Sequence, residues 1–331
     1  MILKKPKFWD YRKPNFISFV LLPFTVILIM NNILTNIFSK KNNPKIKSIC
    51  VGNIYVGGTG KTPFTIKIYQ ILKSLGYNVC VGKKFYNSQK DEQVLLKNKT
   101  NLIFDKNREK IIERSIEENN DIVIFDDGLQ DKRIDYNLKF VCFDNMNWIG
   151  NGLLIPAGPL RETINSLKKF DAVIFKKIEE NTDQEKIINQ IRNINSNIQI
   201  FYSEYFPTNL KDFDLSKKYL IFSGIGNPNS FKRLLIKNNF NIIDEIIYPD
   251  HYNYSLADLV KIKQLAKNID AEIITTEKDF SKISKLNFEN INVLKIDLKM
   301  NNENILINFL KAKINEKLKI FFKIYIYFFF I

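Results

Sequence analysis

Residues 49–63, ICVGNIYVGGTGKTP, determine the fold that we predict for this chain. The apolar run at residues 49–51 predicts a buried strand, and the apolar periodicity from Lys61 to Leu75 predicts a helix. A turn rich in glycine lies between them. A strand, a glycine-rich turn and a helix in this order are typical of a phosphate-binding loop.

The residue types in this turn suit a nucleoside triphosphate. Glycines let backbone N–H groups come within hydrogen-bond distance of phosphate oxygens, and the N-terminus of the following helix favours an anion. Lys61 would reach the β- and γ-phosphates, and Thr62 would hold Mg²⁺. The first helical turn does not need the N–H that Pro63 lacks. The expected nucleotide-binding residues are Val56, Gly57, Gly58, Thr59, Gly60, Lys61, Thr62 and Pro63.

Tyr55 departs from the common pattern GxxxxGK[ST], because it stands at the position of the first glycine. The alternative is therefore an ordinary glycine-rich turn with a surface lysine. A second motif favours the nucleotide site: residues 121–128, DIVIFDDG, predict an apolar strand that ends in Asp126 and Asp127. Carboxylates at that place suit the Mg²⁺ side of such a site.

Composition limits the classes of protein to consider. With 331 residues, 45% of them hydrophobic, the chain can form two α/β domains with real cores. The net charge of +15 would suit nucleic acid or an anionic membrane surface. Its lysines are scattered and no nucleic-acid-binding motif accompanies them, so we expect no nucleic-acid partner. The three cysteines lie in apolar runs without metal-ligand spacing, which predicts reduced core residues.

The amino-terminal region contains a long apolar segment at residues 16–38, FISFVLLPFTVILIMNNILTNIF. It is long enough to reach across a bilayer, but it contains Pro23 and several polar residues in its second half. Lysines and arginines flank it on both sides, which draws both flanks to the cytoplasmic face of a membrane. We expect residues 1–40 to enter that face and return, or to lie in the interface. The alternative is a core helix of a soluble domain.

Strand and helix patterns alternate from residue 47 onward, which predicts a mostly parallel, doubly wound α/β fold. We expect a nucleotide-binding domain at residues 41–205 and a looser connection near residues 198–214. A second α/β domain is expected at residues 206–315. Residues 316–331 form an apolar tail, too short to span a membrane, whose role stays open.

Two further places attract attention as candidate sites. Residues 147–162, NWIGNGLLIPAGPLRE, are too rich in glycine and proline for a helix or a regular strand, yet they end in the adjacent charges Arg161 and Glu162. The alternative is a plain connection with a solvated ion pair. His251, the only histidine, follows a predicted strand, where α/β proteins place chemistry. A structural histidine is the alternative there.

Six motifs occur in one order along the chain: VGNIYVGGTGKTP, DDGLQ, GNGLLIPAGPLRE, FSGIGNP, PDHYNY and TTEKD. With them, the chain from about residue 8 to residue 279 resembles the tetraacyldisaccharide 4′-kinase family. Those lipid A pathway enzymes phosphorylate the 4′-hydroxyl of a tetraacylated disaccharide 1-phosphate, a membrane lipid. The resemblance implies a P-loop NTPase-like fold of two α/β/α sandwich domains, with ATP and Mg²⁺ in the cleft between them. It also implies an amino-terminal segment seated in the inner membrane.

The resemblance assigns roles to particular residues. Lys61 and Thr62 would meet the phosphates and the metal, and Arg161 would lie near the transferred phosphoryl group. The Mg²⁺ site would be completed by Asp126, Asp127 and Glu162. The family's catalytic pair of an aspartate and a histidine maps to Asp91 and His251.

The chain also departs from the family pattern. Residues 82–86 are GKKFY where the family has Ser-Arg-Gly-Tyr-Gly, and Asp131 stands where a histidine is usual. Two other functions are open from the sequence: a membrane-associated P-loop ATPase or GTPase switch, and a drifted family member without catalysis. A GTPase would carry Asn-Lys-x-Asp after a late strand, and residues 276–279, TEKD, misplace the lysine.

Overall fold

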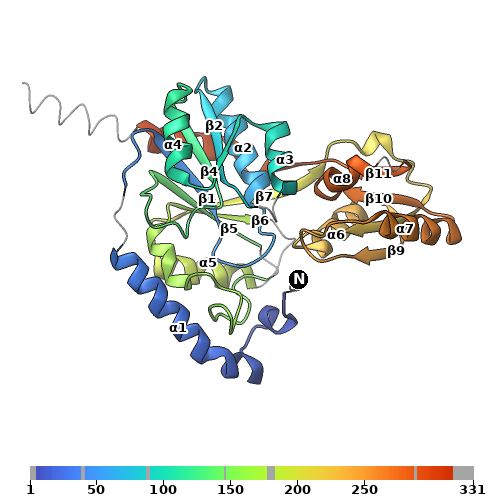
Figure 1. Ribbon diagram of the computed structural model, residues 1–331, viewed down its shortest axis with the longest axis horizontal. Helices are drawn as coiled ribbons and strands as arrows, with labels where there is room; N and C mark the ends of the chain where they lie inside the picture. The colour runs from blue at the N-terminus through green and yellow to red at the C-terminus, as the bar shows by residue number, and fades with distance from the viewer. Residues whose placement is uncertain are drawn as a thin grey trace, which may run out of the picture.

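The computed structural model describes residues 5–38, 42–86, 90–144, 147–176, 183–286 and 289–315. Two β-sheets lie side by side and divide the molecule into a larger and a smaller unit (Figure 1). The larger sheet has eight strands in the order β12-β7-β6-β5-β1-β4-β2-β3. The smaller sheet has four strands in the order β11-β10-β8-β9. The predicted α/β class is confirmed.

Seven strands of the larger sheet run parallel. Its central strands are buried on both faces, and strands buried in this way consist mostly of apolar residues. The central strand β1 (Lys47–Gly52) lies between β4 (Ile122–Asp126) and β5 (Leu138–Phe143). The other parallel strands are β2 (Val79–Lys84), β3 (Leu102–Asp105), β6 (Ala172–Lys176) and β7 (Gln199–Pro207). The carboxyl ends of β1, β4 and β2 therefore meet at one edge of the sheet.

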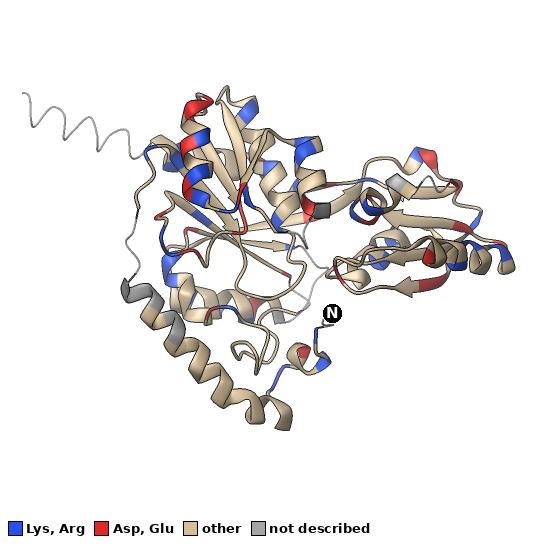
Figure 2. Ribbon diagram, viewed as in Figure 1, with Lys and Arg blue, Asp and Glu red and all other residues tan. Residues whose placement is uncertain are grey.

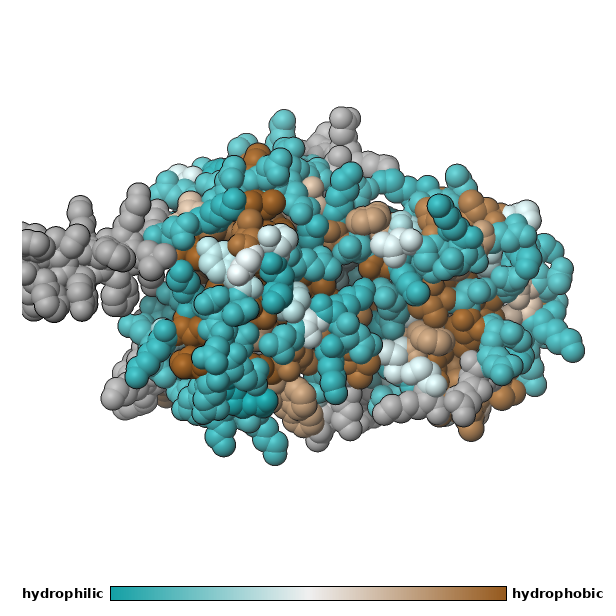
Figure 3. All heavy atoms as spheres, turned by 90° about the horizontal axis from the view of Figure 1, so that it is seen from above, coloured by the Kyte–Doolittle hydropathy of each residue, from teal (hydrophilic) through white to brown (hydrophobic). Residues whose placement is uncertain are grey.

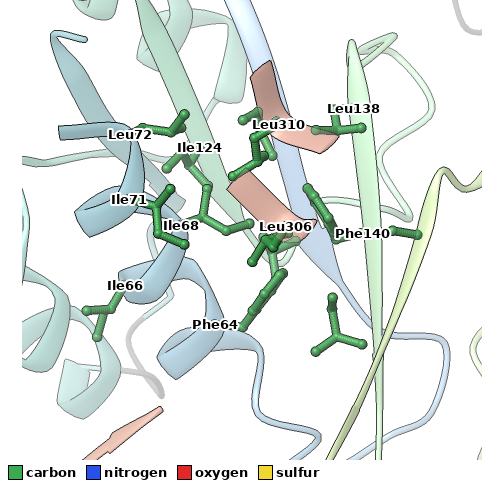
Figure 4. Close-up of a cluster of buried hydrophobic side chains, with 14 of the residues drawn as sticks. Phe64, Ile66, Ile68, Ile71, Leu72, Ile124, Leu138, Phe140, Leu306 and Leu310 are labelled. Carbon is green, nitrogen blue, oxygen red and sulfur yellow. The ribbon is translucent and has the colours of Figure 1, made fainter. Parts of the chain in front are cut away.

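Helices cover both faces of this sheet. Alternate residues of each strand point to opposite faces, so both faces present apolar side chains for helices to pack against. On one face α2 (Lys61–Ser74) packs with a helix over residues 303–315; Figure 4 shows Leu306 and Leu310 beside Phe64 and Ile68. The other face is covered by α4 (Arg108–Glu117) and α5 (Asp183–Ile194). Cys50, Cys80 and Cys142 are buried and free, which confirms their prediction as reduced core residues.

The smaller unit repeats the same layered arrangement. Its parallel strands are β8 (Lys218–Ser223), β9 (Asn241–Ile247), β10 (Glu272–Thr276) and β11 (Ile291–Leu294). One face is covered by α7 (Leu256–Asn268) and α8 (Glu277–Ile283), and the other by α6 (Pro228–Lys237). The two units meet where α3 (Lys90–Lys99) packs against α8.

The division between the units differs from the expected one. β7 continues to Pro207, so the boundary placed after residue 205 falls inside a strand. β12 (Ile296–Met300) then returns to the larger sheet, where it pairs antiparallel with β7, and the helix over residues 303–315 packs on the same sheet. Residues 296–315 therefore belong with the larger unit, because pairing with β7 and burial of Leu306 and Leu310 hold them there.

The amino-terminal segment forms η1 (Lys7–Asp10) and the 23-residue helix α1 (Phe16–Phe38), which contains Pro23. Hydrophilic residues cover most of the face seen from above in Figure 3. By contrast, Figure 2 shows no charged residue along α1. Its apolar side chains are largely exposed, with Phe16 at 81% and Ile27 at 63%, so the alternative of a core helix is wrong. Among the residues that the structure describes, no helix is long and apolar enough to cross a membrane. The expected tail, residues 316–331, lies outside the described residues.

Candidate functional site

The phosphate-binding loop follows β1 at the carboxyl edge of the larger sheet. Gly57 and Gly60 adopt positive φ angles of 139° and 85°, a conformation that L side chains rarely adopt. The buried amide of Asn53 holds the loop from inside: its Nδ2 donates to the carbonyl oxygens of Tyr55 at 2.6 Å and Gly57 at 3.2 Å. The loop is therefore already shaped, and α2 begins directly after it at Lys61.

Residues 147–162 lie directly against this loop. The Val56 N–H donates to the Pro159 carbonyl at 2.9 Å, and the Arg161 N–H donates to the Ile54 carbonyl at 2.7 Å. These bonds hold the irregular segment against the backbone of the phosphate-binding loop. They fix the backbone position from which the side chains of Arg161 and Glu162 extend.

The charged residues predicted at the phosphates come together at the mouth of the loop. Arg161 Nη1 lies 3.0 Å from Asp127 Oδ1, and Lys61 Nζ lies 3.7 Å from Asp127 Oδ2. Burial alone would raise the pKa of Asp127, but the positive charges of Lys61 and Arg161 outweigh it and lower that pKa to about 2. Asp127 is therefore a carboxylate across the physiological pH range, placed between two cations.

Asp126 ends β4 beside the first turn of α2. Its Oδ2 accepts a hydrogen bond from Thr62 Oγ1 at 3.0 Å, and its Oδ1 accepts one from Thr65 Oγ1 at 3.3 Å. A hydroxyl and a carboxylate at this separation fit Mg²⁺, which takes few protein oxygen ligands and completes its shell with water and phosphate. In the described residues, no group of three or more His, Cys, Asp and Glu side chains forms a metal site by itself.

Glu162 lies to one side of these residues. Its Oε1 is 3.5 Å from Gln130 Nε2, and burial raises its pKa. Gln130 also donates to the Asn53 carbonyl at 2.9 Å, so it joins Glu162 to the base of the phosphate-binding loop. Gln130 and Asn53 were not among the predicted site residues, although they belong to the motifs DDGLQ and VGNIYVGGTGKTP.

The smaller unit brings His251 to this site. His251 has a positive φ of 59° and its Nε2 lies 3.8 Å from Glu92 Oε1 of α3. Lys278 Nζ lies 3.0 Å from Asp250 Oδ1 and 3.7 Å from Glu92 Oε1. Asp91, the expected partner of His251, precedes Glu92 in the first turn of α3, but its side chain lies outside the described residues.

A cavity of about 400 Å³ lies between the two units and opens onto the phosphate-binding loop. Residues 56–63 line one side, and residues 225–227 and 276–278 of the smaller unit line another. Gly58 and Gly226 meet across it, since a Cβ added to Gly226 would lie 2.6 Å from the Gly58 nitrogen. The lining of the cavity combines the phosphate-binding groups with apolar side chains such as Phe231 and Leu298.

Comparison with known proteins agrees with this geometry. The family model described as tetraacyldisaccharide-1-P 4′-kinase matches residues 17–315. A tetraacyldisaccharide 4′-kinase of Pelagibacter ubique is 48% identical over 319 residues, which cover 96% of this chain and 100% of the relative. The enzyme of the same name from Rickettsia canadensis is 35% identical over 333 residues, covering 96% and 98% of the two chains.

The chain belongs to the tetraacyldisaccharide 4′-kinase family. It is accordingly a kinase of lipid A biosynthesis, and the alternative of a nucleotide switch is not favoured. This chain shares its fold with a solved structure, the "apo" form of LpxK from Aquifex aeolicus in complex with ATP. The TM-score is 0.65 and the sequence identity is 22%. That likeness covers 90% of this chain and 99% of the Aquifex chain.

In this 4′-kinase family member a second cavity, of about 550 Å³, adjoins the first, and the two share Asp127 and Arg161 in their linings. Its lining carries an excess of positive charge, with Lys84, Arg108, Arg133 and Arg161 against Asp127 and Asp131. Helix α1 contributes Thr25, Leu28 and Ile29. Asp131 orients two of the guanidinium groups, at 2.9 Å from Arg108 Nη1 and 2.8 Å from Arg133 Nη2.

Arg108 and Arg133 were not among the predicted site residues. Each looks like an ordinary surface charge in the sequence, and only the fold shows that they share Asp131. The available signal was the departure of Asp131 from the family's usual histidine, which marked this position as unusual.

Proposed function

We propose that this chain transfers the γ-phosphate of ATP to the 4′-hydroxyl of a tetraacyldisaccharide 1-phosphate at a membrane surface. One observation carries the proposal: Asp127 and Arg161 line both cavities. A nucleotide held by the phosphate-binding loop and an acceptor held in the second cavity would meet at these two residues. A cationic cavity suits an acceptor that carries a phosphate group.

The proposed roles follow from charge and position. Lys61 and Arg161 neutralise the charge that spreads over the phosphoryl oxygens during transfer, and backbone N–H groups of residues 56–62 hold the phosphates. Thr62 and Asp126 would hold Mg²⁺, with Asp127 and Glu162 as the expected further carboxylates, directly or through water. When bound, the ion would supply further neutralisation of phosphate charge.

The acceptor hydroxyl has a high pKa, so a base must remove its proton as it attacks phosphorus. Asp91 is the proposed base and His251 its partner from the smaller unit. If the two act as a unit, the Asp91→Ala/His251→Ala double variant is scarcely slower than the slower single variant. Multiplicative losses in steady-state rates would show that His251 does not act through Asp91.

The proposed place of action is the cytoplasmic face of the inner membrane. α1 has no charged residue between Phe16 and Phe38, and its apolar side chains are exposed. The same helix lines the second cavity through Thr25, Leu28 and Ile29. An interfacial helix in this position would let a four-chain lipid keep its chains in the bilayer while its head group enters the cavity.

The decisive experiment supplies labelled ATP and Mg²⁺ with or without the disaccharide 1-phosphate acceptor, in mixed micelles, and separates products by thin-layer chromatography. We expect labelled lipid, and little free phosphate when the acceptor is absent. Arg108→Met should raise the KM for the acceptor while the KM for ATP stays nearly unchanged, because Arg108 lines only the second cavity. Rapid ATP hydrolysis that ignores the acceptor would overturn the proposal.

A further inference from the structure

Lys83 is a buried lysine at the carboxyl end of β2, with 2% of its side chain exposed. Its Nζ lies 2.7 Å from Asp126 Oδ2 and 2.6 Å from Glu92 Oε2. A buried ammonium must be paired to be tolerated, and here two carboxylates from different elements pair with it. The described mechanism gives this cation no role.

Each of the two carboxylates has a second contact that leads into the site. Asp126 Oδ2 also accepts the hydrogen bond from Thr62 Oγ1 at 3.0 Å. Glu92 Oε1 lies 3.8 Å from His251 Nε2 and 3.7 Å from Lys278 Nζ. A continuous series of hydrogen-bonded and charged contacts thus runs from Thr62 through Asp126, Lys83 and Glu92 to His251. It crosses from the larger to the smaller unit.

We propose that Lys83 and Glu92 are positioning residues that join the phosphate side of the site to its histidine: Lys83 orients Asp126 and Glu92 together, and Glu92 orients His251. The proposal rests on the roles given above to Asp126 and His251, and it adds the residues that hold them. It assigns a function to the first of the two lysines in the GKKFY stretch, one of the places where the chain departs from its family.

The charge state of Glu92 supports a positioning role over a role as base. Burial alone would raise the pKa of Glu92, but Lys83 and Lys278 lower it to about 2. A carboxylate of that acidity is a poor proton acceptor near neutral pH. It remains a permanent negative charge, suited to hold an imidazole and a lysine in fixed orientations.

His251 offers a direct test: it is the only histidine, so every histidine imidazole signal in NMR spectra of the untagged chain would belong to it. Carboxylates near its Nε2 include Glu92 at 3.8 Å and Asp250 at 3.7 Å, and Lys278 pairs with both of these carboxylates. Removing the nearby carboxylate in Glu92→Gln should change the chemical shifts of these signals at neutral pH, because the ring loses the charge that holds its orientation. Lys83→Met removes the buried partner of Glu92 and should change the same chemical shifts by a smaller amount.

Two controls separate positioning from loosened packing. Glu277→Gln removes a carboxylate of α8 that pairs with Lys99 of α3 at 3.2 Å, so it makes the same charge change at the same junction. It should leave the His251 signal in place. Lys83→Arg keeps the charge and should retain the parental chemical shifts of His251, whatever its effect on thermal stability.

Kinase assays provide the second readout. We expect Glu92→Gln to lower kcat by roughly 10- to 100-fold with little change in the KM for ATP. The inference is overturned if Glu92→Gln leaves the His251 chemical shifts unchanged, or if Glu277→Gln changes them equally. The NMR measurement needs no activity, so its failure is distinguishable from a failure of the proposed kinase mechanism.

Discussion

At the scale of single residues, Asp127 is the point on which two cations converge. Lys61 and Arg161 both pair with it, and their charges keep it ionised. Triphosphate oxygens would compete with this carboxylate for the same cations. The cations are therefore held in place before the nucleotide enters, which lowers the cost of ordering them during catalysis.

Lys61 is the residue whose loss should affect the chemistry most directly. Lys61→Ala removes a positive charge from the phosphates, and we expect kcat to fall by roughly 10²- to 10³-fold. The side chain is not part of the apolar cores, so the melting temperature should change little. Steady-state kinetics with a parallel thermal melt checks this, and near-normal turnover by the folded variant would contradict the assignment of residues 56–63.

The ion pairs of Asp131 should make part of the free energy of unfolding sensitive to acid. Hydrogen bonds from Arg133 and the charge of Arg108 overcome the effect of burial and lower its pKa to about 2. Because the folded-state pKa lies below the ordinary value of about 4, its contribution is complete above pH 4 and is lost as the pH falls toward 2.

Asp131→Asn should therefore unfold more easily at pH 7, by about 1 kcal/mol after allowance for solvent screening, and its stability should depend less on pH between 4 and 2. Urea melts at several pH values measure both. Parallel pH curves for parent and variant would show that Asp131 does not supply this contribution. Asp135→Asn is the matched control, since Asp135 is largely exposed and pairs with Lys139.

At the scale of elements, residues 147–162 serve two neighbours at once. Asn151 Nδ2 donates to Ser18 Oγ and to the Ala157 carbonyl, both at 3.0 Å, and Thr25 Oγ1 lies 3.3 Å from the Leu154 carbonyl. The same segment is bonded to the phosphate-binding loop through Val56 and Arg161. It therefore connects α1 with the site.

Asn151→Ala should loosen α1 without altering the nucleotide pocket. Loss of two buried hydrogen bonds is expected to cost about 1–3 kcal/mol. We expect faster proteolytic cleavage between residues 5 and 38 and an unchanged KM for ATP. Cleavage at the parental rate would indicate that other contacts are sufficient to dock α1, and Asn147→Ala provides a comparison from the same segment.

The sequence predicted the elements whose own residues specify them and missed those that depend on distant partners. β1 and β4 are apolar on both faces, and strands were expected there, at residues 49–51 and within residues 121–128. β7 alternates only in part and is completed by β12, about ninety residues later, which local pattern does not reveal. α3 is largely polar and is held by Lys83 and α8.

The site follows the same rule. Motif residues such as Lys61 and Thr62 were predictable because spacing along one turn defines them. Lys83 and Arg108 were not, since their burial and pairing arise only when strands and helices assemble.

At the scale of the whole molecule, α1 presents an apolar surface next to the second cavity. Deleting residues 1–38 should move the protein from the membrane fraction toward the soluble fraction, because the exposed apolar side chains of α1 are then absent. Fractionation and vesicle flotation measure this. Unchanged membrane binding by the truncated chain would place the attachment elsewhere, with residues 316–331 the next segment to remove.

The return of β12 to the larger sheet also makes the smaller unit an insert. Pro207 and Ile296 are partners in the register of β7 and β12, so the chain leaves the larger sheet and re-enters it at adjacent points. Residues 208–295 could therefore be excised and replaced by a two-residue Asn-Gly turn, which would join β7 and β12 as a hairpin. The shortened protein would retain the phosphate-binding loop and both cores of the larger sheet but would lack His251. It would be a nucleotide-binding module without phosphoryl transfer, and its folding would show whether the larger unit is stable without the smaller one.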